Sequence, residues 1–339
     1  MRPLTMKRLL WTCGALAAVL LACVVIALKL GAVPISVIDL VWNLGRVAIG
    51  QGDQLPTEYR LIVFDLRLPR ILLGIMVGAA LSVSGASFQA LLRNPLADPY
   101  VLGVSSGAAL GSILALIIAP QVALLTPLGA FLGAMGTIAA VYFLGRREGQ
   151  LDSTTLLLSG VITASFLMAI VMFLVTTLAG RDLRGYVFWL MGDLSTPIQP
   201  GLRWILTVGL LAGIGAIYTT AADLNLLITG EREAIHLGVD VTRVKLVVYV
   251  SASLLTALAV SAGGAIGYVG LLVPHAVRLV FGSDYRLLIP ASALVGAIAI
   301  VLADTLARTI VAPTELPVGA MTAMAGAPVF IYLLRRGMK

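Results

Sequence analysis

Charged residues are scarce in this sequence. Only 12% of its 339 residues are Asp, Glu, Lys or Arg, whereas 60% are hydrophobic. Soluble domains carry about 25% charged residues, because charge has to cover the surface that faces water. A water-soluble enzyme of this length is therefore excluded, and so is a disordered chain, which would need low hydrophobicity. Most of the surface of the folded protein is expected to face lipid.

Residue types that build catalytic and metal sites are also rare. The two histidines, His236 and His275, have no HExxH or other metal-ligand spacing. The two cysteines, Cys13 and Cys23, lie about 15 Å apart along one apolar helix, too far for a disulfide. Residues 103–107 match GxSxG, but they open an apolar segment instead of following a strand. We predict no catalytic residue and no metal site, so the chain is not expected to be an enzyme.

The sequence also lacks a source of energy for transport. It has no GxxxxGK[ST] loop, so it cannot bind ATP in the P-loop manner. Ion-coupled carriers place ionisable residues in the middle of their spans, and here mid-span carboxylates are absent. The nearest candidate, Asp304, lies close to the end of an apolar segment. A secondary carrier and a non-transporting membrane scaffold stay as alternatives, but uphill transport would need an external motor.

Long apolar segments are what the sequence does contain. A membrane-crossing helix needs roughly 20 apolar residues, and about ten segments meet this requirement. They cover about residues 9–28, 71–92, 100–119, 126–145, 153–178, 203–222, 244–262, 266–282, 287–307 and 316–335. The first could also be read as a signal peptide ending in a lipoprotein-like cleavage site before Cys23, but its length favours a membrane helix. We predict an all-α polytopic membrane protein with a single transmembrane domain, residues 1–339.

The basic residues give the orientation. An even number of spans places both termini on one side, and a cytoplasmic N-terminus puts most Lys and Arg on the inside. We therefore predict a multi-pass protein of the bacterial cytoplasmic (inner) membrane with both termini cytoplasmic. The net charge of +7 lacks the clustered basic patch of a nucleic-acid partner. Lys29, Arg46, Arg60, Arg67 and Arg70 gather in one outer connection, which indicates a partner on that side.

Two features predict how helices end and pack. The outer stretch 34–50 has Ser36 and Asp39 at capping-box spacing, so a short helix at the outer interface is expected. GxxxG spacing, which lets helix backbones approach closely, is expected to mark packing contacts. It occurs at Gly74 and Gly78, at Gly103, Gly107 and Gly111, at Gly129 and Gly133, and at Gly263 and Gly267.

The inner connection 223–243 is the longest on its side and also predicts a short helix. Glu231 and Glu233 suit the start of this helix, and Gly238 suits its end. Ala234, Leu237 and Gly238 share one face. A small apolar face of this kind can dock in a groove of a soluble protein, or the helix can rest on its own protein.

Several longer motifs occur in order along nearly the whole chain. They are RLPR at 67–70, GAALS at 78–82, Gln89, RNPLADP at 93–99, LGVSSG at 102–107, GE at 230–231 with AIHLG at 234–238, GLLVPHAVR at 270–278, ELPVG at 315–319 and GAP at 326–328. With these motifs the sequence resembles the permease subunits of type II binding-protein-dependent ABC importers, the FecCD family, which take up ferric siderophores, heme or cobalamin.

The resemblance implies a homodimer of ten-helix subunits around a central translocation path in membrane lipid. It also implies two cytoplasmic ABC ATPase subunits, which bind ATP and Mg, and a periplasmic or lipid-anchored substrate-binding protein. This chain would bind no cofactor itself and would contact no nucleic acid. An iron(III)-siderophore complex is the expected cargo, because it is the commonest in the family, with cobalamin or heme as alternatives.

The resemblance assigns roles to three groups of residues. The residues implied to couple to the ATPase are Gly230, Glu231, Glu233, Ala234, Leu237 and Gly238. Those implied to form the cytoplasmic gate are Asn94, Leu96, Ser153 and Thr154. Those implied to dock the binding protein are Arg67, Arg70 and Arg308. Asn94 could instead be a turn residue before a proline, and Ser153 a helix N-cap. The arginines could instead anchor lipid phosphates. Pro69 fits the first turn of a helix, so Arg70 is expected to project from a helix start.

Overall fold

The computed structural model describes residues 4–31, 33, 35–51, 55–122, 124–147, 150–177, 184–195 and 200–337. In this part of the chain seven helices are long and apolar enough to cross a membrane, and three apolar helices are shorter. The long ones are α1 (Met6–Lys29), the run α3 (Thr57–Arg60), η2 (Leu61–Arg67) and α4 (Leu68–Leu91), then α6 (Leu125–Leu144), α7 (Ser153–Thr177), α9 (Pro200–Thr219), α12 (Val241–Gly263) and α14 (Tyr285–Thr309). The shorter ones are α5 (Val104–Ile118), α13 (Val269–Phe281) and α15 (Val318–Gly337).

These helices correspond one to one with the predicted spans, so the all-α polytopic fold is confirmed. The remaining elements are α2 (Val37–Ala48), η3 (Pro99–Leu102), α8 (Arg184–Leu190), α10 (Ala221–Leu227), α11 (Glu231–His236) and the antiparallel two-residue strands β1 (Arg146–Arg147) and β2 (Gln150–Leu151). In the strand pair Arg146 faces Leu151 and Arg147 faces Gln150. The predicted outer helix is α2, and the Ser36 hydroxyl caps it by accepting from the Ile38 N–H.

The start of the second span differs from the prediction. The helix runs without interruption from Thr57 to Leu91, so Pro69 lies inside it and Arg70 does not project from a helix start. The segment before the proline is a π-helix, in which the Leu68 N–H donates to the Val63 carbonyl. This wider turn accommodates Pro69, which has no N–H and would clash with a carbonyl four residues back in a regular α-helix. Pro69 does lie in the first turn of α4, as predicted, but α4 continues an earlier helical segment, so the proline does not mark a free helix start.

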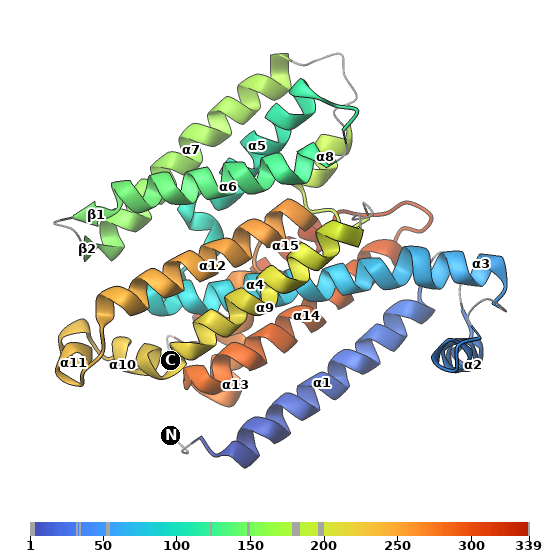
Figure 1. Ribbon diagram of the computed structural model, residues 1–339, viewed down its shortest axis with the longest axis horizontal. Helices are drawn as coiled ribbons and strands as arrows, with labels where there is room; N and C mark the ends of the chain where they lie inside the picture. The colour runs from blue at the N-terminus through green and yellow to red at the C-terminus, as the bar shows by residue number, and fades with distance from the viewer. Residues whose placement is uncertain are drawn as a thin grey trace.

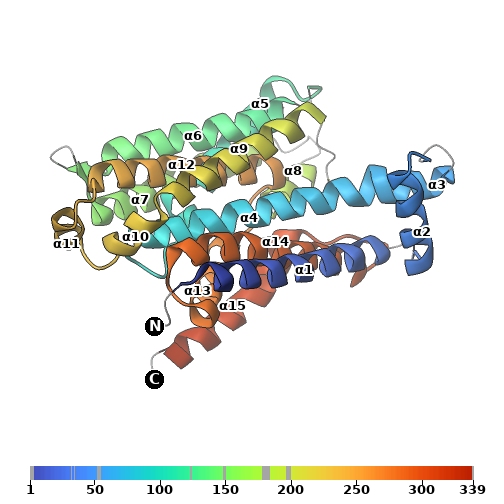
Figure 2. The same ribbon diagram turned by 60° about the horizontal axis from the view of Figure 1, so that its bottom comes forward.

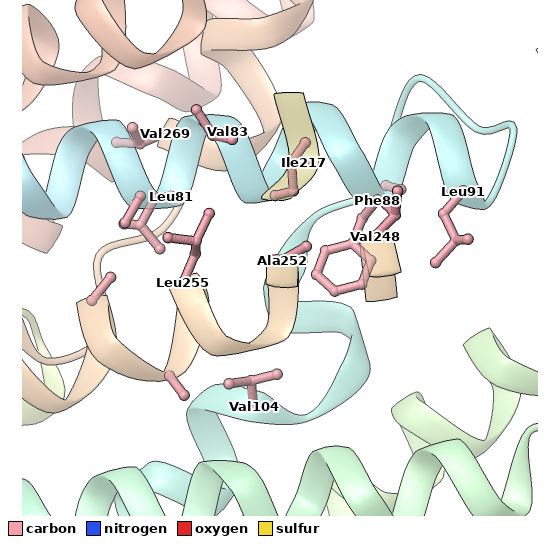
Figure 3. Packing of buried hydrophobic residues seen from close by; sticks show 14 of the residues in the cluster. Leu81, Val83, Phe88, Leu91, Val104, Ile217, Val248, Ala252, Leu255 and Val269 are labelled. Atoms are coloured by element: carbon pink, nitrogen blue, oxygen red, sulfur yellow. The ribbon is translucent and has the colours of Figure 1, made fainter. Parts of the chain in front are cut away.

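The helix α4 forms the centre of the subunit. It crosses the middle of the molecule in both views, with α12 and α9 on one side and α14 and α1 on another (Figures 1 and 2). In its most apolar stretch, 83% of the residues are buried. Figure 3 shows Leu81 and Phe88 of α4 beside Val248, Ala252 and Leu255 of α12. The core of this membrane protein is thus built around one helix that has little contact with lipid.

Glycine lets the backbones of several helices touch. A Cβ at Gly107 or Gly111 of α5 would overlap the backbone around Gly133 or Gly129 of α6, which confirms the GxxxG prediction for this pair. Gly78 of α4 lies in the same way against α14. The prediction is wrong for the pair 263 and 267, because α12 ends at Gly263. Gly103 also precedes its helix, with a φ of 77°.

The outer helices expose most of their apolar surface. Only 6%, 11% and 17% of the most apolar stretches of α1, α7 and α9 are buried. Both termini lie at the end of the molecule that carries α10, α11 and the β1–β2 pair, whereas α2 and α3 lie at the opposite end (Figures 1 and 2). We call these the inner and the outer end, following the predicted orientation.

Candidate functional site

Four ionisable side chains meet at the outer end, and we call them the outer cluster: Arg70, Asp304, Arg308 and Glu315. The Arg70 guanidinium lies 2.8 Å from the Asp304 carboxylate and 2.7 Å from the Glu315 carboxylate. The Arg308 guanidinium lies 3.0 Å from the second oxygen of Asp304, one helical turn away. Asp304 is buried and Glu315 is half-exposed. The cluster ties α4 to α14 and to the connection that leads to α15.

The third predicted docking residue, Arg67, binds backbone carbonyls. Its guanidinium donates to Leu28 at 2.6 Å and to Val33 at 2.5 Å. Arg308 reaches the Ala27 carbonyl at 3.4 Å. The last carbonyls of a helix have no partner within the helix and carry a partial negative charge, so a buried guanidinium stabilises them. Both arginines therefore cap the end of α1.

The expectation of an exposed arginine face is wrong for Arg67 and Arg308, because both are only 7% exposed and both contact their own chain. Anchoring to lipid phosphate does not describe them either. The sequence reasoning missed Asp304 as the partner of Arg70 and Arg308, and Glu315 as a partner of Arg70. The i,i+4 spacing of Asp304 and Arg308 in an otherwise apolar segment was the available signal. The docking role itself stays a prediction.

The predicted coupling helix is α11, at the inner end. Ala234 is fully buried in the core of its own chain, so the expectation that it faces an ATPase is wrong. An alanine is small enough to let this short helix lie close to the protein. Leu237 is 64% exposed, and a Cβ at Gly238, where φ is 87°, would meet open space. Ile235, which the sequence reasoning missed, is 58% exposed and extends this surface.

The first residue of α11 is held by two cations. The Glu231 carboxylate lies 2.8 Å from the Lys245 ammonium of α12 and 3.4 Å from the Arg93 guanidinium in the connection after α4. Lys245 is nearly buried, whereas Arg93 is half-exposed. Gly230 precedes the helix with a φ of 150°, and a Cβ there would overlap the exposed Glu233 carboxylate.

The connection after α4 contains the first two predicted gate residues. The Asn94 side-chain oxygen accepts from the Leu96 N–H at 2.9 Å, which makes Asn94 a turn residue, as the alternative interpretation proposed. Leu96 is 43% exposed. Both residues lie at the inner end, and their gate role stays a prediction.

The other predicted gate residues lie at the start of α7. The Asp152 carboxylate accepts from the Thr155 N–H at 2.8 Å, so Asp152 is the capping residue and the N-cap alternative for Ser153 is wrong. The side chain of Ser153 lies outside the described part of the structure. Thr154 is exposed. A turn that places Asp directly before Ser-Thr-Thr offers several capping residues, and sequence alone does not choose among them.

Two further motif residues meet beside the gate connection. The Arg278 guanidinium of α13 donates to the Gln89 side-chain oxygen of α4 at 3.1 Å. The Gln89 amide donates to the Leu271 carbonyl at 3.2 Å. The motifs at Gln89 and 270–278 therefore converge on the inner half of the contact between α4 and α13.

Comparison with known proteins identifies the chain. The model of the FecCD transport family matches residues 19–336. The chain belongs to this family. It is 45% identical over 311 residues to the cobalamin import system permease protein BtuC of Halobacterium salinarum, covering 90% of this chain and 82% of the relative. It is 41% identical over 280 residues to the hemin transport system permease protein HmuU of Yersinia pestis, covering 81% and 83%.

A solved structure agrees with the fold of this FecCD-family protein. It is an inward-facing ABC transporter of the metal-chelate type, with a TM-score of 0.81, 31% identity and coverage of 96% of this chain and 99% of the other. The protein is therefore the permease of an ABC importer, a multi-pass inner-membrane component that transports and is not an enzyme.

The carboxyl of Asp98, between α4 and η3 of this FecCD permease, predicts a pH dependence. Asp98 accepts from the Tyr100 N–H at 2.9 Å, and burial raises its pKa from 3.8 to about 6. The folded state therefore holds a proton that the unfolded state has released, so stability falls as the pH rises from about 4 to 6. Asp98→Asn keeps the acceptor without the charge. We expect it to raise the free energy of unfolding by about 1–2 kcal/mol at pH 7.5, measured by thermal unfolding in detergent.

The gain should vanish below about pH 3, where Asp98 is protonated in both states. Asp240→Asn is the matched control, because Asp240 also caps a helix, through the Arg243 N–H, but is exposed. A gain from Asp98→Asn that is the same at both pH values, or that Asp240→Asn reproduces, would contradict the assignment.

Proposed function

We propose that two copies of this chain form the translocation path of an importer for an intact metal chelate. Two cytoplasmic ABC ATPase subunits, which bind ATP and Mg, supply the energy, and a periplasmic or lipid-anchored binding protein delivers the cargo. The observation that carries this proposal is the family match over nearly the whole chain, combined with an exposed apolar surface on α11 at the inner end. The chain itself is proposed to bind no cofactor.

The cargo expected from the sequence is an iron(III)-siderophore complex, and we retain it as the first candidate. Cobalamin is the second, because the relative at 45% identity is named as a cobalamin permease. Heme follows from the relative at 41% identity. All three are bulky metal chelates, so a translocation path of the same overall shape can accommodate each of them. The side chains that line the path in the dimer would determine which chelate is transported.

The test is uptake by proteoliposomes that hold the permease, its ATPase and its binding protein. Radiolabelled ferric siderophore, cobalamin and heme are offered separately, with ATP or without it. ATP-dependent and vanadate-sensitive uptake of one of them identifies the cargo. Uptake driven by an ion gradient without ATP would instead support a secondary carrier, and the absence of any ATP-dependent uptake would contradict the proposal.

The coupling assignment predicts a loss of assembly for Gly238→Trp. The indole would stand on the exposed surface formed by Ile235, Leu237 and Gly238 and prevent close approach of an ATPase. We expect about tenfold less ATPase to copurify with the variant permease. The measurement is the ratio of the two subunits after affinity purification.

Gly282→Trp is the control for backbone strain. Gly282 follows α13 with a φ of 97°, close to that of Gly238, and a Cβ there also meets open space. The control should assemble normally. Equal losses in both variants would show that strain, not docking, causes the defect. Ala234→Trp is unsuitable for this test, because Ala234 is buried and its replacement would disturb the fold.

A further inference from the structure

The turn that ends α4 has an arginine, Arg93, at a position that usually holds glycine. The Arg93 N–H donates to the Ala90 carbonyl and the Asn94 N–H donates to the Gln89 carbonyl. This is the Schellman pattern, which needs a left-handed residue at the position of Arg93 and is normally completed by glycine. The φ of Arg93 is 47°.

Three other helices of this chain end at a glycine with a positive φ, and the glycine after α11 completes the same pattern. Gly238 follows α11, Gly264 follows α12 and Gly282 follows α13, with φ values of 87°, 69° and 97°. At the end of α4 the chain instead places a long cationic side chain in a conformation that L-residues rarely adopt. Retained backbone strain of this kind points to a role for the side chain itself.

The side chain of Arg93 joins the gate connection to the coupling helix. Its guanidinium lies 3.4 Å from the carboxylate of Glu231, the first residue of α11. The same carboxylate lies 2.8 Å from Lys245 of α12, whose side chain is only 9% exposed. Arg93 is followed directly by Asn94 and Leu96, the predicted gate residues.

The two ion pairs of Glu231 differ in their surroundings. In the pair with Lys245 the ammonium group is nearly buried, so solvent screens this pair only weakly. The pair therefore stabilises the packing of the start of α11 on α12. The pair with Arg93 is half-exposed on one side, so solvent screens it and it can break and form again at low cost. The first pair suits an anchor and the second suits a contact that changes between states.

We propose that Glu231 and Arg93 are positioning residues that pass the movement of α11 to the gate connection 94–96. The proposal rests on the proposed function, in which α11 contacts the ATPase and this connection closes the path. A displacement of α11 by the ATPase moves the Glu231 carboxylate, and Arg93 makes the gate connection follow it.

The experiment uses the complex of permease and ATPase with both native cysteines replaced and Leu96→Cys as a reporter. The rate of labelling by N-ethylmaleimide is measured without nucleotide and after trapping with ATP, Mg and vanadate. In the parent complex we expect the two rates to differ by about fivefold or more. In Arg93→Gly, which keeps the backbone turn and removes the side chain, we expect them to become equal.

Three controls separate a positioning role from a structural one. Arg93→Gly should unfold at the same temperature as the parent or higher, because glycine relieves the strain. It should also retain ATP hydrolysis and copurify with the ATPase. Glu231→Gln should reproduce the labelling defect, and the double variant should be no worse than Glu231→Gln alone, because Glu231→Gln already removes the contact with Arg93 together with the contact with Lys245. Asp240→Asn, which changes an exposed acid after α11 and keeps the oxygen that accepts from the Arg243 N–H, should behave like the parent.

The outcomes are distinct. If the parent complex shows no nucleotide-dependent labelling of residue 96, the gate assignment fails and the proposal fails with it. If the parent responds and Arg93→Gly responds equally, only the link is wrong. If Arg93→Gly loses the ATPase on purification, Arg93 contacts the ATPase itself and the proposed role is wrong.

Discussion

Replacing Gly85 by alanine is expected to destabilise the permease by about 3 kcal/mol, enough to lower the amount of folded protein in the membrane severalfold. Gly85 lies in the central helix α4, and a Cβ there would overlap the backbone of Gly270 in α13. The backbone of α4 fixes the position of this Cβ and the atoms that it meets are backbone atoms of Gly270, so no side-chain rotation can relieve the clash. Thermal unfolding in detergent and the yield of monodisperse protein measure the effect.

The matched control is Gly136→Ala in α6. A Cβ at Gly136 meets nothing within 4 Å, and alanine favours helix over glycine by about 1 kcal/mol. This variant should be as stable as the parent or slightly more stable. If Gly85→Ala is tolerated as well as Gly136→Ala, α4 and α13 do not pack backbone to backbone at Gly85 and Gly270.

Asp304→Asn is expected to have an effect of similar size, about 3 kcal/mol. The substitution leaves the guanidinium groups of Arg70 and Arg308 close together without the buried carboxylate between them. The cost arises mainly from the buried Arg308 charge, which loses its carboxylate, whereas Arg70 keeps Glu315. The expected result is a lower unfolding temperature and weaker packing of α1 against α14, because Arg308 also contacts the end of α1.

Asp65→Asn provides the comparison for Asp304→Asn. Asp65 is an exposed aspartate on the same side of the molecule, in the π-helical segment before α4. Its replacement should change stability by less than about 0.5 kcal/mol. Equal stability of the two variants would show that the outer cluster contributes little to the fold.

The outer cluster also bears on the docking prediction. Arg67 and Arg308 hold the end of α1, so charge reversal at either position is expected to reduce stability and docking together. A reciprocal Glu→Arg change in the binding protein can restore only the docking part. Arg70 differs, because one of its partners, Glu315, is half-exposed and lies where an incoming carboxylate could compete with it. Docking affinity that does not fall with salt would contradict an electrostatic interface.

The sequence determined the parts of this protein that depend on local composition. A run of apolar residues must be helical and buried in lipid or protein, because unpaired backbone groups in an apolar environment are costly. The ten apolar helices of the described residues were therefore predictable, as were the glycine contacts between α5 and α6 and the start of α2 at Ser36. The family was visible as well, because its motifs are short, ordered and local.

Only the tertiary structure decided what the polar side chains of these motifs contact. Arg67 meets Leu28 across 39 positions, and Arg70 meets Asp304 across 234. No local pattern encodes such pairs, since they depend on which helices lie side by side. The burial of Ala234 and the contact of Arg93 with Glu231 have the same origin. A spacing shows which residues share a helix face, but only the packed neighbours determine whether that face meets water, lipid or the protein itself.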